Sequence, residues 1–517
     1  MKTSFAIAFA AALISISSAA SAESASANAA SSPCADGKCS YIDFTSGKDF
    51  KRQDLYGPNS QVAGAGASGI SEVVISGSTF SSSTPGHFIF TGSQKITIEN
   101  TTFSNATDSA LWFRSHKGPS NTEIAADNFD SVDVTLSNVR LINNTSGSGS
   151  GAYVYGKIDM TMTDGEVRGN KVTATEPVKN TDIYSGAGIE VKSGNVIFEN
   201  VDFDDNVVSA AGACATGGAI LVDKTTGIKE NGKDLIGDVT FKITKNGLTY
   251  AGNNVIGKTE LMTDTYGWYA YTSGGFLFLD RSSRGTFDIA EGVTLTIGEA
   301  GADYEKNPEL DSIASAVPNN DNYPDYAQLN KKGAGTLQMN ASMDKYFALF
   351  NVEEGTFNIA QEWQNCAKTT VSGGTLNAAG GLVLDNLKQE KNSYYQNGTI
   401  TVAGGSLVAP SIAFKNSAGA TNKTDKATLT IKSGTVTTKD LNTTNGVLTL
   451  SGGALNVTGN LTVAANTFEL RGGELATSYK NFFAASQAGG TLAGNANLMN
   501  IKGTKASGII AFTDDIG

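Results

Sequence analysis

The chain has 517 residues, a formal net charge of −12 and only 17% charged residues, while glycine alone occupies 59 positions. This negative balance, without any cluster of lysines and arginines, excludes phosphate-driven binding, so we expect no nucleic-acid partner. A composition rich in glycine, serine, threonine and asparagine and poor in charge disfavours helices and favours strands and turns.

The first residues have the features of a secretory signal peptide. Lys2 supplies the positive charge, Phe5–Ile16 is the apolar stretch, and Ala20-Ser21-Ala22 is a cleavage site, which predicts a mature chain that starts at Glu23. No later apolar run approaches the roughly 18 residues that a membrane helix needs. We therefore expect an exported, soluble chain.

Residues 23–69 are rich in serine, alanine and glycine, which predicts a leader followed by a cap over exposed strand edges. Cys34 and Cys39 lie close enough in sequence to form a disulfide in an oxidising compartment. Cys214 and Cys366 are too far apart along the predicted stack of coils to bond, so we expect them to be small buried residues.

From residue 73 to 206, a pattern of two apolar residues two positions apart, a polar turn residue and a further apolar residue occurs five times. Each copy predicts a strand with one buried face, a turn, and the start of a second strand. Several copies end in asparagine, a residue suited to turns, and stacked asparagines can form an amide ladder. The copies begin at Val73, Ile96, Val134, Met160 and Val196.

A shorter pattern, glycine followed by any residue and an apolar residue, dominates the second half of the chain. Most of its copies are separated by about 20 residues, the range that is typical of a solenoid. Glycine is expected where the backbone turns sharply or where two backbones approach closely. The copies begin at Gly335, Gly355, Gly374, Gly405, Gly434, Gly453, Gly473 and Gly490.

Three short strands and three turns fit into one such period. The sequence therefore predicts an all-β, right-handed, single-stranded parallel β-helix with about 20–25 residues per coil. A flat β-sandwich is the alternative, but hairpin signals are few. The side chains that we expect to face inward are Ile98, Leu136, Phe198, Ile220, Leu337, Leu376 and Leu455.

Three motifs carry a resemblance to known families. FDDN at Phe203–Asn206 and GGAI at Gly217-Gly218-Ala219-Ile220 resemble the repeats of polymorphic outer-membrane proteins, and KKGAGTLQMN at Lys331–Asn340, with Gly335 and Leu337, resembles the autotransporter-associated β-helix repeat. Both are families of type V secreted passengers. The resemblance implies a cell-surface or outer-membrane location, possible release from the cell, and an outer-membrane translocator barrel as partner.

That barrel does not follow in this chain, and we expect either a truncated chain or a separate barrel partner. The resemblance also implies a non-catalytic adhesin or stalk that binds a host glycan, a protein surface or another copy of itself. We place the β-helix at residues 70–298 and 331–517, with a loop insertion at 299–330 and a projecting hairpin within 223–248. Tyr266, Trp268, Tyr269 and Tyr271 either pack between coils or form a binding platform.

The alternative function is that of a polysaccharide-acting enzyme, a pectin lyase-like hydrolase or lyase. Asp182 followed by Asp204 and Asp205 resembles paired catalytic carboxylates, but the downstream histidine and Arg-x-Lys of such hydrolases are missing. Asp202, Asp204 and Asp205 are candidate calcium ligands, although solvated turn acids are the simpler interpretation. We therefore predict no catalytic residues, no metal site and no cofactor.

Overall fold

In the computed structural model, the described residues between 34 and 512 belong to one compact unit. The structure describes residues 34–512 except for 43–51, 58–68, 82, 84, 116–130, 148, 175–182, 211, 231–232, 259–261, 264–268, 318–325, 389–394, 421–424, 464–466 and 479–508. The predicted cleavage site at Ala22 and Glu23 and the glycine pattern at Gly490 lie outside the described residues.

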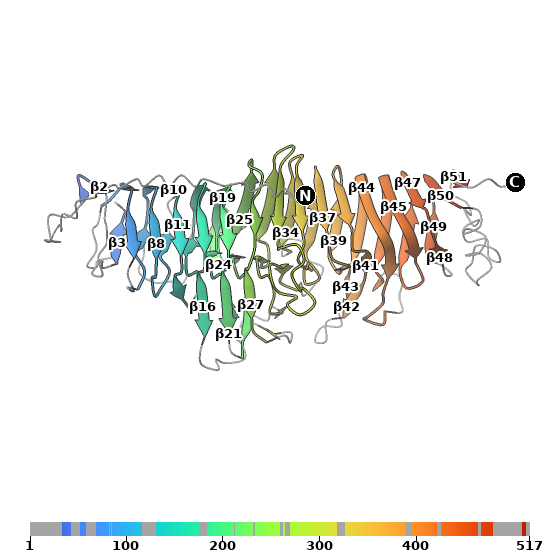
Figure 1. Cartoon of the computed structure of the whole chain (residues 1–517), viewed down its shortest axis with the longest axis horizontal. Coiled ribbons are helices and arrows are strands. Elements are labelled where there is room, and N and C mark those ends of the chain that lie inside the picture. Colours follow the sequence, from blue (N-terminus) through green and yellow to red (C-terminus); the bar gives the residue numbers. More distant parts are fainter. Residues whose placement is uncertain are drawn as a thin grey trace, which may run out of the picture. The chain divides into compact units, whose positions relative to one another are not determined.

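Successive strands of the unit stack in sequence order, as the colours in Figure 1 show. Among the described strands, the pairings are parallel apart from four antiparallel hairpins, and most strands pair with the equivalent strand of the next coil. The first face consists of β2 (Lys38–Ile42), β4 (Glu72–Ser76), β7 (Lys95–Glu99), β10 (Val132–Ser137), β14 (Ile158–Thr163), β19 (Gly194–Glu199), β25 (Lys233–Ile243), β31 (Arg284–Ile289), β34 (Gln328–Lys332), β36 (Leu349–Val352), β39 (Lys368–Val371), β44 (Thr399–Phe414), β45 (Thr428–Asn442), β46 (Val447–Leu450) and β49 (Phe468–Leu470).

Two further faces complete each coil, and the long strands β44 and β45 run through all three faces. The second face consists of β5 (Thr79–Ser81), β8 (Thr102–Ser104), β11 (Arg140–Ile142), β15 (Glu166–Arg168), β20 (Asp202–Asp204), β26 (Thr249–Tyr250), β32 (Thr294–Ile297), β35 (Thr336–Met339), β37 (Thr356–Ile359), β40 (Thr375–Ala378), β47 (Ala454–Val457), β50 (Glu474–Thr477) and β51 (Ile509–Phe512). The third consists of β3 (Gln53–Tyr56), β6 (Phe88–Thr91), β9 (Leu111–Arg114), β13 (Ala152–Tyr155), β18 (Ile189–Val191), β23 (Ile220–Val222), β30 (Leu277–Leu279), β33 (Ile313–Ser315), β38 (Trp363–Asn365), β41 (Leu382–Leu384) and β48 (Leu461–Thr462).

This arrangement is the predicted right-handed parallel β-helix, and its core follows from the alternation of the strands. In β19, for example, Val196 and Phe198 are buried whereas Ile197 between them is 37% exposed. Identical alternation in neighbouring coils superposes apolar side chains, so that Phe198 lies between Met162 of β14 and Phe241 of β25. All seven side chains predicted to face inward are fully buried: Ile98, Leu136, Phe198, Ile220, Leu337, Leu376 and Leu455.

The predicted amide ladder is present and runs through the buried turns that follow the second face. The side-chain nitrogen of Asn144 donates to Asn170 at 2.9 Å, that of Asn170 donates to Asn206 at 2.9 Å, and that of Asn206 donates to Asn253 at 3.0 Å. Asn144, Asn170, Asn206 and Asn253 are all fully buried. Because an unsatisfied buried amide costs about 1–3 kcal/mol, the ladder holds each coil in register with the next.

Glycines form a second ladder in the later coils, as the repeated pattern predicts. A Cβ atom on Gly434 would lie 2.1 Å from the carbonyl oxygen of Gly405, and one on Gly453 would lie 2.4 Å from that of Gly434. Gly434 and Gly453 also have φ values of 79° and 69°, in the left-handed region. Two independent constraints therefore require glycine at this turn.

A lateral layer on the earlier coils was not predicted. Short strands leave the stack and pair with each other on one side of it (Figure 1). They bury a separate cluster that includes Val172, Val208 and Val255. These strands are β12 (Thr145–Ser146), β16 (Lys171–Ala174), β21 (Val207–Ala210) and β27 (Asn254–Ile256), with β17 (Ile183–Ser185) and β22 (Cys214–Thr216) beside them.

The expected coil length holds only for coils without insertions, and the boundary at residue 70 was wrong. Lys38–Ile42 and Gln53–Tyr56 already pair in parallel with the following coils, so the helix starts within the segment assigned to the leader and cap. Coils that carry insertions are about twice as long as expected, since Arg284 aligns with Gln328, whereas Leu349 aligns with Lys368. Turn insertions lengthen a coil without disturbing the stacked strands.

The two predicted insertions also need correction. Within 299–330, Ile313–Ser315 is a buried strand of the third face, and Gln328 already belongs to β34. Within 223–248, β24 (Lys224–Glu230) forms the expected hairpin with the start of β25, but β25 then continues as a coil strand with Val239 and Phe241 buried. Smaller hairpins pair β28 (Met262–Thr263) with β29 (Tyr269–Ala270) and β42 (Asn386–Lys388) with β43 (Tyr395–Asn397).

The cysteines lie at two kinds of position. Cys39 is disulfide-bonded, and the residue opposite it in the antiparallel pair of β1 (Cys34–Ala35) with β2 is Cys34. Cys214 and Cys366 are buried thiols, and burial raises the pKa of each to about 12. Across the described part of the chain, no helix could cross a membrane.

Candidate functional site

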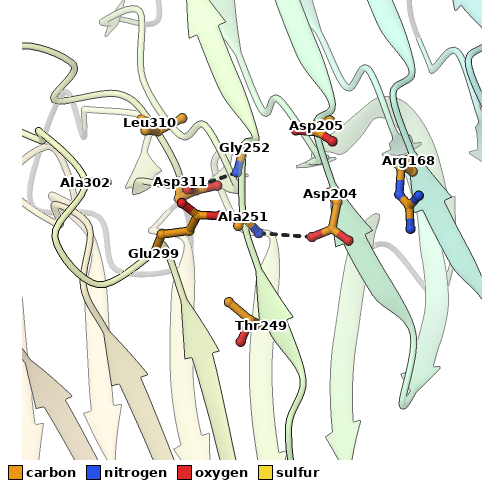
Figure 2. Close-up of a pocket in the computed structure, with 10 residues that line it drawn as sticks. All are labelled: Arg168, Asp204, Asp205, Thr249, Ala251, Gly252, Glu299, Ala302, Leu310 and Asp311. Atoms are coloured by element: carbon orange, nitrogen blue, oxygen red, sulfur yellow. Dashed lines mark hydrogen bonds between the residues drawn. The ribbon is translucent and has the colours of Figure 1, made fainter. Parts of the chain in front are cut away.

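An acidic groove opens where four successive strands of the second face end. The cavity is about 540 Å³, and Figure 2 shows the ends of β15 and β20, the turn after β26 and the segment after β32 around it. Because parallel strands end at the same edge, polar residues that follow them are brought together. The lining residues are Arg168, Asp204, Asp205, Thr249, Ala251, Gly252, Glu299, Ala302, Leu310 and Asp311.

Asp311 occupies the last position of the amide ladder and is only 1% exposed. Its Oδ1 accepts the backbone N–H of Asn253 at 2.8 Å, and its Oδ2 accepts the backbone N–H of Gly252 at 3.2 Å. Burial raises the pKa of this carboxyl to about 7, an effect that the two backbone hydrogen bonds partly offset. Asp311 is thus an acid in place of the next asparagine, and both of its oxygens bind the backbone.

Asp204 projects outward at the end of β20, half-buried beside Arg168 of the preceding coil (Figure 2). Its Oδ1 accepts the backbone N–H of Ala251 at 3.2 Å. Burial raises its pKa to about 6, and the nearby carboxylates Asp202 and Asp205 contribute further. Among the groove acids, Asp204 therefore has the geometry and the pKa of a weak proton donor at neutral pH.

Asp205 has a different environment from Asp204 and Asp311, the two carboxyls whose pKa is raised. It is exposed, and its φ of 56° lies in the left-handed region at the turn after β20. Gly252 in the turn of the next coil has a φ of 75°, in the left-handed region that favours glycine, and the Asp205 Oδ1 lies close to it. Asp182, the third acid of the enzyme hypothesis, lies outside the described residues.

The described residues contain no group of three or more histidine, cysteine, aspartate or glutamate side chains placed to hold a metal ion. Asp202, Asp204 and Asp205 therefore do not converge as calcium ligands would. The motif residues have structural positions: Phe203, Ala219, Ile220 and Leu337 are in the core, Asn206 is in the amide ladder, and Gly218 and Gly335 pass close to the backbone of neighbouring coils. Gly217 forms a left-handed turn with a φ of 62°.

The aromatic cluster predicted near residue 270 is described only in part. Tyr266 and Trp268 lie outside the described residues, as does the side chain of Tyr269. The Tyr271 ring packs 5.9 Å from that of Phe347, and the Lys345 ammonium lies 5.5 Å from its centre. Packing between coils therefore accounts for Tyr271.

The groove acids predict a pH-dependent stability. The folded-state pKa of Asp311 is raised from 3.8 to about 7, so its protonated form is favoured by folding. The contribution of Asp311 protonation to the free energy of unfolding is fully present below about pH 4 and is lost as the pH rises through 7. We expect the urea unfolding midpoint of the wild type to fall between pH 4.5 and 7.5. The midpoint of Asp311→Asn should fall less over the same range.

The matched control is Asp205→Asn, the same substitution at an exposed residue that also has a positive φ. We expect it to leave the pH dependence of the midpoint unchanged. A wild-type midpoint that rises steadily over this pH range and does not respond to Asp311→Asn would contradict the assignment.

The sequence indicated Asp204 and Asp205 but not Arg168, Glu299 or Asp311 as residues of one groove. Arg168 occupies the strand position equivalent to Asp204 in the preceding coil, and this register could have been read from the repeats. Glu299 and Asp311 lie in an insertion that has no repeat pattern, so no signal placed them.

Comparison with known proteins identifies the fold of the first coils. Residues 34–182 match the family model described as "Right handed beta helix region". Searches of curated proteins and of solved structures return no match. The match agrees with the parallel pairing of these coils.

Proposed function

We propose that this right-handed β-helix protein is an exported passenger of the type V secretion class, and that it acts at the cell surface as a non-catalytic adhesin or stalk. Its partners would be an outer-membrane translocator barrel during export and a glycan, a protein surface or a second copy afterwards. The signal-peptide features at residues 2–22 and the passenger-like repeats motivate this proposal.

The observation that carries the non-catalytic part is the hydrogen bonding of the groove acids. Hydrolysis of a glycosidic bond needs two carboxyls, one to donate a proton and one to act as base or nucleophile. Asp311 uses both oxygens to bind the backbone of Gly252 and Asn253, and Asp204, the other groove carboxyl with a raised pKa, uses one oxygen to bind the backbone of Ala251. This arrangement supports a role for the acids in holding coils together.

The test is to display residues 23–517 on a non-adherent bacterial cell and to measure attachment to immobilised glycans and matrix proteins. The matched control is the same display of the Phe198→Asp variant, which is expected to unfold the coils around β19 but keeps the export signals. We expect attachment by the native chain and not by the variant. Display of the folded chain without attachment to any surface, and without self-association, would contradict the proposal.

A further inference from the structure

Two neighbouring strands of the third face, β9 and β13, carry large side chains on their outer surface. Leu111 and Phe113 of β9 are fully buried in the core, whereas Trp112 and Arg114 between and after them point outward and are half-buried. In β13, Tyr153 aligns with Trp112 and Tyr155 aligns with Arg114. The outer surface of these two coils is therefore an aromatic platform, which we define as Trp112, Arg114, Tyr153 and Tyr155.

The platform is held in shape by its own contacts. The rings of Trp112 and Tyr153 lie 4.9 Å apart at an angle of 33°, and those of Tyr153 and Tyr155 lie 6.3 Å apart. The guanidinium carbon of Arg114 lies 4.1 Å from the centre of the Trp112 ring. Such rigid, partly exposed aromatic groups offer a large contact area at little cost in conformational entropy.

Arg114 has no ion-pair partner among the described residues, whereas Arg52 and Lys192 near it do. In the described part of the chain, no carboxylate lies within ion-pair distance of Arg114, although Arg52 pairs with Asp54 at 2.9 Å. Lys192 occupies the position of the next coil that is equivalent to Tyr155. It pairs with Glu190 at 2.8 Å and with Asp223 at 3.0 Å. A half-buried guanidinium beside stacked rings is thus left to bind an anion from outside the chain.

We propose that the platform binds a carboxylated sugar ring, with the apolar face of the ring on Trp112 and Tyr153 and its carboxylate on Arg114. This inference rests on the proposed function, because it supplies the glycan that the surface protein would bind. The net charge of −12 does not prevent such binding, since charges more than about 8 Å away are screened at physiological salt.

The test is titration of the full mature chain with three hexasaccharides while its tryptophan fluorescence is recorded. One probe contains glucuronate (hyaluronan), one contains galacturonate, and one is neutral (cellohexaose). The fluorescence is recorded in a Trp268→Phe background, in which Trp112 reports on the platform and Trp363, 1% exposed, is sheltered from ligand. We expect at least one carboxylated probe to bind, at least tenfold more tightly than the neutral probe, with affinity that falls as salt rises. Which carboxylated probe binds distinguishes an animal-matrix source from a plant source.

Two variants separate the roles of the platform residues. We expect Arg114→Gln to weaken binding of the carboxylated probe at least tenfold and to remove most of its salt dependence. Trp112→Ala should abolish binding, and Trp112→Tyr should retain part of it; because both substitutions remove the fluorescent reporter, these two variants are measured by isothermal titration calorimetry. The control is Arg140→Gln, a neighbouring arginine that is paired with Glu166 at 2.6 Å on a different face, and we expect it to leave affinity unchanged.

Affinities are compared only for variants whose unfolding midpoint equals that of the wild type. Loss of the fold is then not mistaken for loss of the binding site. Equal affinity for neutral and carboxylated probes, unchanged binding by Arg114→Gln, or no binding of any probe would overturn the platform assignment. If displayed cells still attach to glycan surfaces in those cases, only this inference fails and the adhesin proposal stands.

Discussion

Replacing Phe198 with aspartate is expected to unfold the coils around β19, whereas the same substitution at Ile197 should leave them folded. Phe198 is fully buried, and its ring lies 5.1 Å from Phe203 and 5.6 Å from Phe241. Removal of the ring costs about 3–5 kcal/mol, and an aspartate at this position adds a buried group without partners. The total exceeds the contribution of most single residues to stability.

Ile197 is an unusually close control because it is the adjacent residue of the same strand, 37% exposed on the outer surface. Hydrogen exchange is the suitable measurement, since solenoid coils interact mainly with their neighbours and unfold locally. We expect loss of protection in β14, β19 and β25 for Phe198→Asp only. Equal loss of protection in the two variants would show that the face assignment of β19 is incorrect.

The second large effect is expected for Gly434→Ala. The added Cβ would lie 2.1 Å from the carbonyl oxygen of Gly405, and the φ of 79° is unfavourable for alanine. The left-handed conformation costs about 1–2 kcal/mol, and the steric overlap adds about 1–3 kcal/mol unless the two coils separate. We expect a lower urea unfolding midpoint and loss of protection in β44 and β45.

Gly419→Ala separates these two contributions. Gly419 has a φ of 66°, but a Cβ there would meet no atom within 4 Å. We therefore expect Gly419→Ala to cost only the conformational term of about 1–2 kcal/mol. If the two substitutions lower the midpoint equally, the close approach of Gly434 to Gly405 does not contribute to stability. The backbone conformation of the turn would then be the sole reason for glycine in the ladder.

The coil architecture could be predicted because the repeats express it directly. Alternation such as Val196-Ile197-Phe198 defines the buried face of a strand, and equivalent alternation in the next coil defines its neighbour. The glycine pattern and the asparagines were predictable for the same reason, because a turn residue recurs at each coil. Coil length was not predictable, since insertions such as the one before β33 add residues without a repeated signal.

The candidate site was predicted only in part. Asp204 and Asp205 lie in a repeat, but Glu299 and Asp311 reach the groove from an insertion, and the placement of Asp311 depends on tertiary contacts with Gly252 and Asn253. The platform residues Trp112 and Tyr153 lie at outward positions of ordinary strands. Their alignment depends on the register between coils, which the length of the intervening segment does not reveal.

The measurement that tests the central claim most directly is a search for turnover by the folded chain. Mature protein is incubated with uronate-containing and neutral polysaccharides at pH 5 to 8, and new reducing ends and unsaturated products are quantified. We expect no product above that of the Phe198→Asp variant, while the polymer that is bound keeps its length. Cleavage by the native chain that is lost on Asp204→Asn and retained on Asp205→Asn would contradict the account and identify Asp204 as a catalytic acid.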